Sequence, residues 1–407
     1  MQKSKSTSSN SDLNPVGNSF INLRSGKNIL KREIITSATN MKVNNTYIFD
    51  DIAFSILSKL PLKSFNRFKC VRKSWSLLYE NTHFMNMFCN NLLSNSYYDG
   101  ASILVHDRTV RGNVFYSLSG ERFENKFKLD SSNSFKKYLS WYSISGFGSI
   151  NGTLCLHAYG KIVLWNPTTE TMKLLPPSPV QSVDTLLIFY YLHGFGYDDL
   201  INDYKVIRYV NSVSLDGLGD NSLAPFLVWE IYSLRSNSWR KLDVDMPASL
   251  YCEAETQVYM DGVCHWLCEA EECVVSFYLS SELFFITPIS SDEDVCFEFG
   301  AWINLVVLNG SVALIKYHRE KTTFYISILG ELGVEESWAK LFIVGPLSCV
   351  ERPLGVGMTG EIFFVRKDKE LVWLDLKTQM IEEVGFKDVN SIDRIIIYKE
   401  KFDQLEQ

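Results

Sequence analysis

Apolar and polar positions divide the chain into two regions of different periodicity. Between residues 47 and 93, apolar residues recur at helical spacing. One face of the first predicted helix carries Ile52, Ile56, Leu57 and Leu60. Asp50 and Asp51 suit the start of this helix, because carboxylates there meet unpaired backbone N–H groups. Pro61 is expected to end it, since proline cannot continue a helix.

Two more short helices are predicted in the same region, one containing Phe65 and Phe68 and one around Trp75. So small a segment cannot bury this many large apolar groups by itself. We therefore expect its apolar faces to bind another surface. An ordinary three-helix packing unit without a partner is the alternative.

From about residue 100 the pattern changes to short β-branched and aromatic runs separated by turns. Asn151-Gly152, Asp261-Gly262 and Asn309-Gly310 are strong hairpin signals. Similar strand centres recur at positions 116, 165, 232, 277, 326 and 374. A period of about 45–50 residues is typical of a four-stranded propeller blade. We expect a small all-α segment followed by an all-β domain, a β-propeller of about six blades, with a sandwich as the competing architecture.

One interval of this repeat, from 165 to 232, is 67 residues long and breaks the period. It contains a polar, Gly-rich stretch, residues 211–224, that is predicted to be a long loop. Long loops on rigid scaffolds tend to carry recognition, and a passive insertion is the alternative. The candidate target-binding residues are Asn211, Asp216, Gly217, Asp220 and Asn221.

The sequence predicts three regions: a disordered segment at 1–45, the helical segment at 46–93 and the β domain at 100–400. The distribution of charge between these regions bears on whether the protein binds nucleic acid. Residues 1–93 carry 13 Lys+Arg and 5 Asp+Glu, and the chain's net charge is −7, so residues 94–407 carry −15. So acidic a β domain argues against nucleic acid as a partner.

Targeting signals are not apparent. The first residues lead into no apolar signal segment, and with nine cysteines we expect reduced thiols in the nucleus or cytoplasm. A transit peptide is the weaker alternative for residues 1–45. No apolar run reaches the length of a membrane span, and the longest, residues 186–192, is predicted to be a buried strand.

No motif predicts catalysis, a cofactor or a metal. The one constellation to weigh is Cys264-His265 followed by Cys268 and Cys273. Zinc needs four converging ligands, whereas Cys264 and His265 would point to opposite faces of a strand. We interpret these as buried core residues, and we assign no catalytic residue.

Several motifs in order resemble the plant F-box proteins that carry an F-box-associated interaction domain. In the helical segment they are Asp50-Asp51, Ile56-Leu57, Lys59-Leu60-Pro61-Leu62-Lys63-Ser64, Arg67-Phe68-Lys69-Cys70-Val71 and Lys73-Ser74-Trp75. In the β domain they include Leu164-Trp165-Asn166-Pro167, Leu175-Pro176-Pro177, Gly194-Phe195-Gly196-Tyr197-Asp198, Asp203-Tyr204-Lys205-Val206 and Ser238-Trp239-Arg240. One departure is Ile48-Phe49, where the family usually has Leu-Pro.

The resemblance implies a substrate-recognition subunit of a Skp–cullin–F-box ubiquitin ligase. Its partners would be a Skp-type adaptor, through it a cullin, and an unidentified target protein, with no nucleic acid or membrane. The residues implied to bind the adaptor are Ile48, Phe49, Ile52, Ile56, Leu57, Leu60, Pro61, Leu62, Phe65, Arg67, Phe68, Val71 and Trp75. The Ile48-Phe49 departure favours the alternative, a protein-binding scaffold that works without the ligase.

Overall fold

The fold is described by a computed structural model in which two compact units, residues 1–53 and 54–407, are distinguished. The structure describes residues 49–60, 62–94, 100–109, 112–129, 142–158, 160–178, 186–214, 227–248, 257–289, 302–387, 389 and 391–401.

Helices are found among the described residues of the helical segment, and the first of these helices begins at Asp50. The helices are α2 (Asp50–Leu57), α3 (Leu62–Phe68), α4 (Lys73–Ser76), the 3-10 turn η1 (Leu78–Glu80) and α5 (Thr82–Ser94). Asp50 and Asp51 occupy the first turn of α2, as expected. The helix ends at Leu57, earlier than Pro61 predicts, and Pro61 itself lies outside the described residues.

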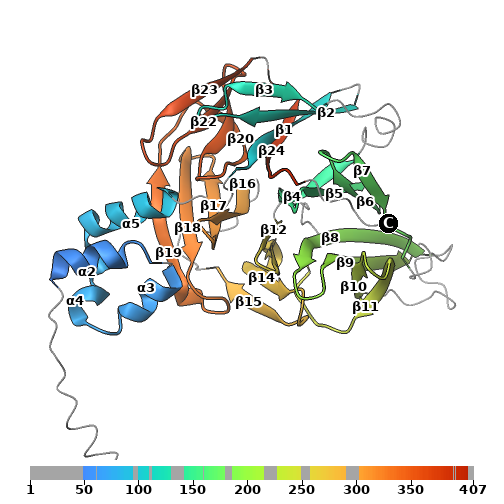
Figure 1. Ribbon diagram of the computed structural model, residues 1–407, viewed down its shortest axis with the longest axis horizontal. Helices are drawn as coiled ribbons and strands as arrows, with labels where there is room; N and C mark the ends of the chain where they lie inside the picture. Colours follow the sequence, from blue (N-terminus) through green and yellow to red (C-terminus); the bar gives the residue numbers. More distant parts are fainter. Residues whose placement is uncertain are drawn as a thin grey trace, which may run out of the picture. The chain divides into compact units, whose positions relative to one another are not determined.

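The rest of the described chain is built of units of four antiparallel strands, which we call blades 1 to 6 (Figure 1). Blades 3 to 6 are separate four-stranded sheets, whereas blades 1 and 2 form one eight-stranded sheet, because their first strands pair in parallel at Ile397 and Gly148. Blade 1 is β24 (Ile392–Tyr398), β1 (Ser102–Thr109), β2 (Gly112–Ser119) and β3 (Asn125–Lys128). Blade 2 is β4 (Ser143–Ile150), β5 (Thr153–Ala158), β6 (Lys161–Asn166) and β7 (Thr171–Leu174). Blade 3 is β8 (Leu186–Asp198), β9 (Asp203–Ser214), β10 (Leu227–Ser233) and β11 (Ser238–Leu242).

The remaining blades have the same order of strands. Blade 4 is β12 (Gln257–Met260), β13 (Val263–Cys268), β14 (Cys273–Tyr278) and β15 (Phe284–Pro288), with the 3-10 turn η2 (Glu269–Glu271). Blade 5 is β16 (Trp302–Leu308), β17 (Ser311–His318), β18 (Thr323–Leu329) and β19 (Trp338–Val344), with η3 (Glu335–Ser337). Blade 6 is β20 (Val350–Val356), β21 (Ile362–Arg366), β22 (Leu371–Leu374) and β23 (Ile381–Phe386).

The blades close into a ring. Their first strands, β24, β4, β8, β12, β16 and β20, each contact the next around the centre (Figure 1). Strand β24 comes from the end of the domain and pairs with β1, with Ile397 opposite Ile103. This pairing joins the two ends of the domain in one blade and so closes the ring. The all-β propeller predicted from the repeat is confirmed.

The predicted strand centres and turns have a structural explanation. Each of the six centres lies on the third strand of its blade: β2, β6, β10, β14, β18 and β22. The three Asn-Gly and Asp-Gly turns join the first two strands of blades 2, 4 and 5, and both residues of each turn have positive φ. That is the conformation which makes such pairs strong hairpin signals.

The predicted loop in the 67-residue interval is wrong at its first residue. The interval contains the two longest described strands, β8 with 13 residues and β9 with 12. Asn211 is not in a loop but in β9, opposite Phe189 and Leu227. The other candidate residues, Asp216, Gly217, Asp220 and Asn221, lie outside the described residues. Residues 186–192 do form a strand, but Leu187 and Phe189 are exposed rather than buried.

Candidate protein-interaction sites

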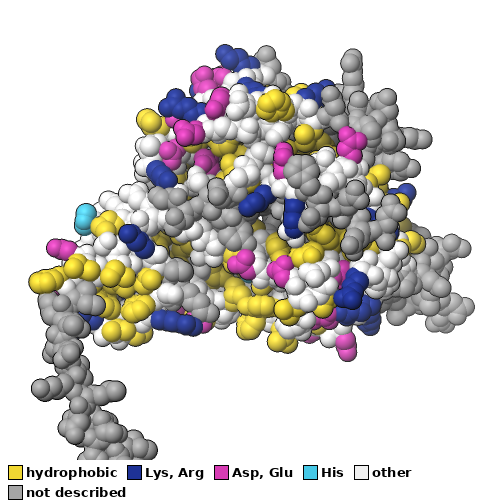
Figure 2. Space-filling view, in the orientation of Figure 1, with side chains coloured by type: hydrophobic (Ala, Val, Ile, Leu, Met, Phe, Trp, Pro, Cys, Tyr) yellow, Lys and Arg dark blue, Asp and Glu magenta, His cyan; other side chains and the backbone are white. Residues whose placement is uncertain are grey.

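The adaptor-binding residues implied by the resemblance divide into an exposed and a buried set. Ile52 and Ile56, one turn apart on α2, are each about half exposed at 53% and 52%. The rest of the exposed set is Phe49, Arg67, Phe68 and Val71. Figure 2 shows hydrophobic side chains gathered on the surface of the helical segment. Large apolar groups left exposed in this way are typical of an interaction surface.

The buried set packs inside the chain. Leu57, Leu62 and Phe65 are 3%, 1% and 0% exposed, and Phe65 stacks on Phe84 with ring centroids 5.1 Å apart. Leu60 and Trp75 are partly buried against the same cluster, and Ile328 of β18 belongs to it as well. These residues therefore contribute to the protein's own core rather than to its surface. Ile48 and Pro61 lie outside the described residues.

The helical segment and blade 5 approach each other closely at Gly330. A Cβ atom at this position would lie 2.6 Å from Nδ2 of Asn66 and 3.5 Å from Cδ2 of Leu62. Leu93, in α5, is likewise buried in the core shared by blades 5 and 6. Residues 54–94 are therefore packed onto the propeller rather than joined to it by a linker.

The Cys-His constellation lies in the core of blade 4. Cys264, Cys268 and Cys273 are buried free thiols, and His265 shares a hydrogen bond between Nδ1 and Oγ of Ser276 at 2.8 Å. Burial lowers the pKa of His265 to about 3, which keeps the imidazole neutral. Within the described part of the chain, no group of three or more His, Cys, Asp or Glu side chains is placed to hold a metal ion.

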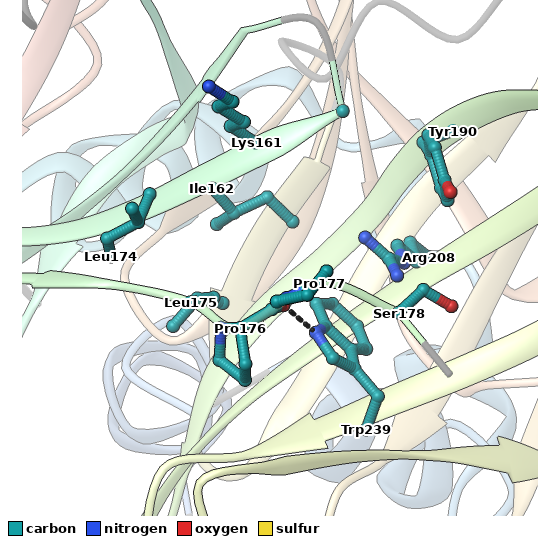
Figure 3. Close-up of a pocket in the computed structure, with 11 residues that line it drawn as sticks. Lys161, Ile162, Leu174, Leu175, Pro176, Pro177, Ser178, Tyr190, Arg208 and Trp239 are labelled. Carbon is teal, nitrogen blue, oxygen red and sulfur yellow. Dashed lines mark hydrogen bonds between the residues drawn. The ribbon is translucent and has the colours of Figure 1, made fainter. Parts of the chain in front are cut away.

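A pocket between blades 2 and 3 brings together polar and aromatic groups that the sequence analysis did not select (Figure 3). Its volume is about 220 Å³. Its walls are Gly160, Lys161, Ile162, Leu174, Leu175, Pro176, Pro177, Ser178, Tyr190, Arg208 and Trp239. Nε1 of Trp239 donates to the carbonyl of Pro176 at 2.9 Å and so joins the two blades.

Arg208 is the most constrained group of this pocket. It is 3% exposed, and its Nε donates to Oε2 of Glu230 at 2.9 Å. The guanidinium lies between two rings, 3.7 Å from the centroid of Trp239 and 4.5 Å from that of Tyr190. Burial lowers the pKa of Arg208, and the charge of Glu230 opposes that shift.

The register of blade 3 produces this arrangement. Glu230 of β10 stands opposite Arg208 of β9, and Tyr232 stands opposite Trp239 of β11. Paired residues and residues two apart share a sheet face, so Arg208, Glu230 and Trp239 all face blade 2. Gly160 allows Tyr190 to approach, since a Cβ there would lie 2.7 Å from Cδ2 of that ring.

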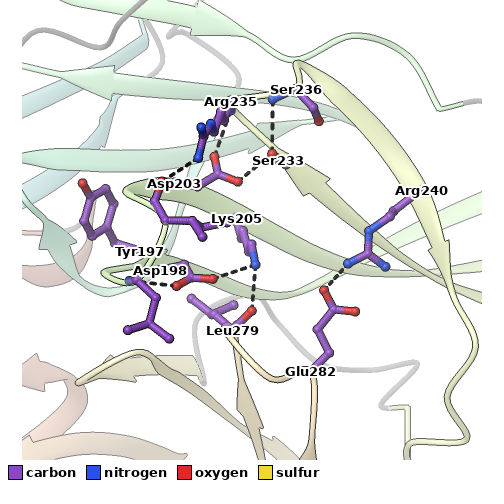
Figure 4. A network of polar contacts seen from close by, with 12 residues as sticks. Tyr197, Asp198, Asp203, Lys205, Ser233, Arg235, Ser236, Arg240, Leu279 and Glu282 are labelled. Atoms are coloured by element: carbon purple, nitrogen blue, oxygen red, sulfur yellow. Dashed lines mark hydrogen bonds and ion pairs between the residues drawn. The ribbon is translucent and has the colours of Figure 1, made fainter.

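A second polar network joins blades 3 and 4 and explains two of the family motifs (Figure 4). Nζ of Lys205 lies 2.8 Å from Oδ2 of Asp198 and donates to the carbonyl of Leu279 at 2.7 Å. Asp203 accepts hydrogen bonds from Oγ of Ser233 and the backbone N–H of Arg235. The bond from Lys205 to Leu279 joins the two blades, and the contacts of Asp203 fix the turn within blade 3, so the buried charged groups of these motifs have structural partners.

Comparison with known proteins identifies the family. Residues 102–404 match the family described as F-box associated beta propeller domain. The match covers more than half of the chain, which therefore belongs to this family, and the resemblance seen in the motifs is confirmed. F-box family proteins are generally non-catalytic adaptors. No helix among the described residues is long and apolar enough to cross a membrane.

Curated relatives are distant. An F-box/kelch-repeat protein of Arabidopsis thaliana is 25% identical over 327 residues, which cover 74% of this chain and 80% of the relative. An F-box protein of the same plant is 28% identical over 246 residues, covering 58% and 72%. Among solved structures, a chain of a nidogen/laminin complex has a TM-score of 0.41 and 10% identity, covering 74% of this chain and 100% of that chain.

Proposed function

We propose that this protein is the substrate-recognition subunit of a Skp–cullin–F-box ubiquitin ligase. Family membership supports the class, and the observation that carries the proposal is the exposed apolar set of the helical segment. This set would dock on a Skp-type adaptor and through it on a cullin. The propeller would hold a target protein for ubiquitination and proteasomal degradation, in the nucleus, the cytoplasm or both.

The chain's contribution would be proximity rather than bond chemistry. A subunit that binds adaptor and target together raises the effective concentration of target lysines near the ubiquitin-charged enzyme. The packing of Leu62 and Leu93 against the propeller supports this role, because a fixed attachment limits the positions a bound target can take. No residue of this chain is assigned to catalysis.

Adaptor binding is tested by replacing Ile52 and Ile56 with serine. Each side chain is exposed, so the variant should fold, and loss of each anchor should cost about 2 kcal/mol of binding free energy. The measurement is co-purification with a co-expressed Skp-type adaptor, followed by its Kd. The matched control is Leu200→Ser, an exposed apolar residue of the propeller, which should bind the adaptor like the wild type.

Wild-type protein that fails to retain the adaptor would contradict the proposal and favour the scaffold that works without the ligase. Unchanged binding by the Ile52→Ser/Ile56→Ser variant would instead reject this docking face. Targets would be sought by affinity capture from cells in which the proteasome and cullin activation are blocked, so that bound targets are not degraded.

A further inference from the structure

We propose that the pocket between blades 2 and 3 binds the carboxylate of an acidic side chain, Asp or Glu, in a segment of the target protein. The receiving group is the free edge of the Arg208 guanidinium. This inference rests on the proposed function, since it assigns the propeller's target a chemical feature.

The hydrogen bonds of Arg208 leave donors unused. Its Nε donates to Oε2 of Glu230, and Nη2 lies 2.8 Å from the same oxygen without hydrogen-bond geometry. The other carboxylate oxygen of Glu230 accepts from Oγ of Ser178 at 2.7 Å. Glu230 is therefore fully engaged, and Nη1 makes no hydrogen bond to the described residues. Nη1 is not among the buried atoms of the described residues, so this unused N–H donor is available to an acceptor that enters the pocket.

The two rings decide from which direction that acceptor can come. The rings of Trp239 and Tyr190 both pack on the guanidinium, which restricts the directions from which a ligand can approach it. The edge of an arginine side chain presents parallel N–H groups that match the two oxygens of a carboxylate. Figure 3 shows Arg208 between these rings at one end of the pocket.

The charge of the pocket suits a single carboxylate. Among the lining residues that the structure describes, only Lys161 and Arg208 are charged, and Glu230 beside Arg208 offsets one of those charges. The net charge of this group of three is +1, within a region of the chain that carries −15. One carboxylate would bring the local charge to zero, and Lys161 at the exposed rim would attract it from solution.

The size and the remaining walls favour a side chain over a larger ligand. A volume of about 220 Å³ is below the range of roughly 300–1,000 Å³ typical of small-molecule sites. Ile162, Leu175 and Pro176 supply apolar walls for the methylene groups of the side chain. The half-exposed Leu174 extends that apolar surface outward, where neighbouring residues of the target would lie.

The test compares two fluorescent heptapeptide pools that differ only in a central Glu or Gln and have uncharged, randomised flanks. Fluorescence anisotropy with the purified full-length chain should give at least about tenfold tighter binding of the Glu pool, because the amide cannot accept two charge-assisted hydrogen bonds. Lys161→Gln should weaken the Glu pool about two- to threefold. Lys377→Gln, an exposed lysine of blade 6, is the matched control and should change nothing.

The paired variant Arg208→Gln/Glu230→Gln tests whether Arg208 causes the preference for the Glu pool. This pair removes both buried charges together, so the fold should survive, and the Glu preference should disappear. Equal binding of the two pools by the wild type, or a preference that persists in the folded paired variant, would overturn the proposal. Displacement of the Glu pool by micromolar glutarate would assign the pocket to a free small acid and would also overturn it.

Adaptor co-purification is measured on the same preparations. Adaptor binding without a Glu preference would reject the pocket and leave the proposed function standing. A Glu preference without adaptor binding would reject the ligase role and leave the pocket standing.

Discussion

The helical segment and the pocket between blades 2 and 3 are both proposed to bind proteins, but they are built from opposite chemistry. The helical segment exposes the apolar side chains of Ile52, Ile56 and Phe68. The pocket buries an arginine and a glutamate that are 3% and 1% exposed. One region gains from removing apolar surface from water, while the other depends on how buried charges are paired.

This difference determines how a substitution in each region should change the stability of the fold. When a side chain in an apolar cluster is truncated, the loss of stability increases with the volume of the cavity left behind and does not depend on the titration of a charged group. A buried ion pair contributes little net stability while it is intact, but leaves a costly unpaired charge when one partner is lost. Substitutions in the two regions should therefore follow different rules.

The largest expected effect is that of Phe65→Ala in the helical segment. Phe65 is fully buried among Phe84, Phe88 and Ile328, so truncation should lower the free energy of unfolding of this region by about 3–5 kcal/mol. Urea unfolding followed by circular dichroism measures this. Phe127→Ala, at an exposed position in blade 1, is the control and should change stability little. Equal effects of both substitutions would contradict the assigned packing.

Arg208→Ala should come next, because it leaves Glu230 buried without its cation. We expect a loss of about 3 kcal/mol in the free energy of unfolding, measured by urea denaturation. Replacing both partners, as Arg208→Met with Glu230→Leu, should cost about 1 kcal/mol or less, since no unpaired charge remains. A double variant less stable than the single one would show that the cost comes from lost packing instead.

Sequence and structure agree best where the relevant residues are close in the chain. Ile52 and Ile56 are one helical turn apart, and the Asn-Gly and Asp-Gly turns are local signals. The blade repeat was also visible, because every blade uses a similar third strand. Exposed Ile56 and buried Leu57 could not be told apart from the sequence, since the burial of Leu57 depends on a cluster that includes Ile328, far away in the chain.

The pocket could not be predicted from the sequence in the same way. Tyr190, Arg208, Glu230 and Trp239 belong to four different strands, and only their register brings them together. The motifs Leu175-Pro176-Pro177 and Ser238-Trp239-Arg240 were recognised as family features, but their spacing gives no role. The bond from Trp239 to Pro176 shows that they meet across two blades.

Buried polar groups of the propeller should make its stability depend on pH, through His265 for example. Its pKa is lowered to about 3 in the folded state, against about 6.5 when unfolded. This contribution is complete above pH 6.5 and is lost as the pH falls toward 3, because the unfolded chain binds the proton first. Between pH 7 and pH 5 the loss should be about 2 kcal/mol.

Thermal unfolding at pH 7 and pH 5 tests this pH dependence in wild type and His265→Asn. Asparagine retains a hydrogen-bonding group toward Ser276 but does not titrate, so the variant should lose less stability on acidification. An identical acid response in both proteins would assign the dependence to other groups, such as His157, whose pKa is lowered to about 4 by burial.

The smallest expected effect on stability is that of Ile56→Ser, which separates the two sets within the helical segment. Ile56 is 52% exposed, so its replacement should change the free energy of unfolding by only about 0.5 kcal/mol. Leu57→Ser, one residue further on and 3% exposed, should be strongly destabilising, because it places an unpaired hydroxyl in the apolar cluster.

Urea unfolding and adaptor affinity, measured together, complete this last comparison. If Ile56 is a docking residue, Ile56→Ser should lose adaptor affinity while keeping its stability, whereas Leu57→Ser should lose affinity only as far as it unfolds. The two properties would then vary independently at neighbouring positions, as expected if one side of α2 faces a partner and the other faces the protein's own core. A fall in stability of the same size for both variants would mean that Ile56 is a packing residue, and the adaptor would have to bind elsewhere.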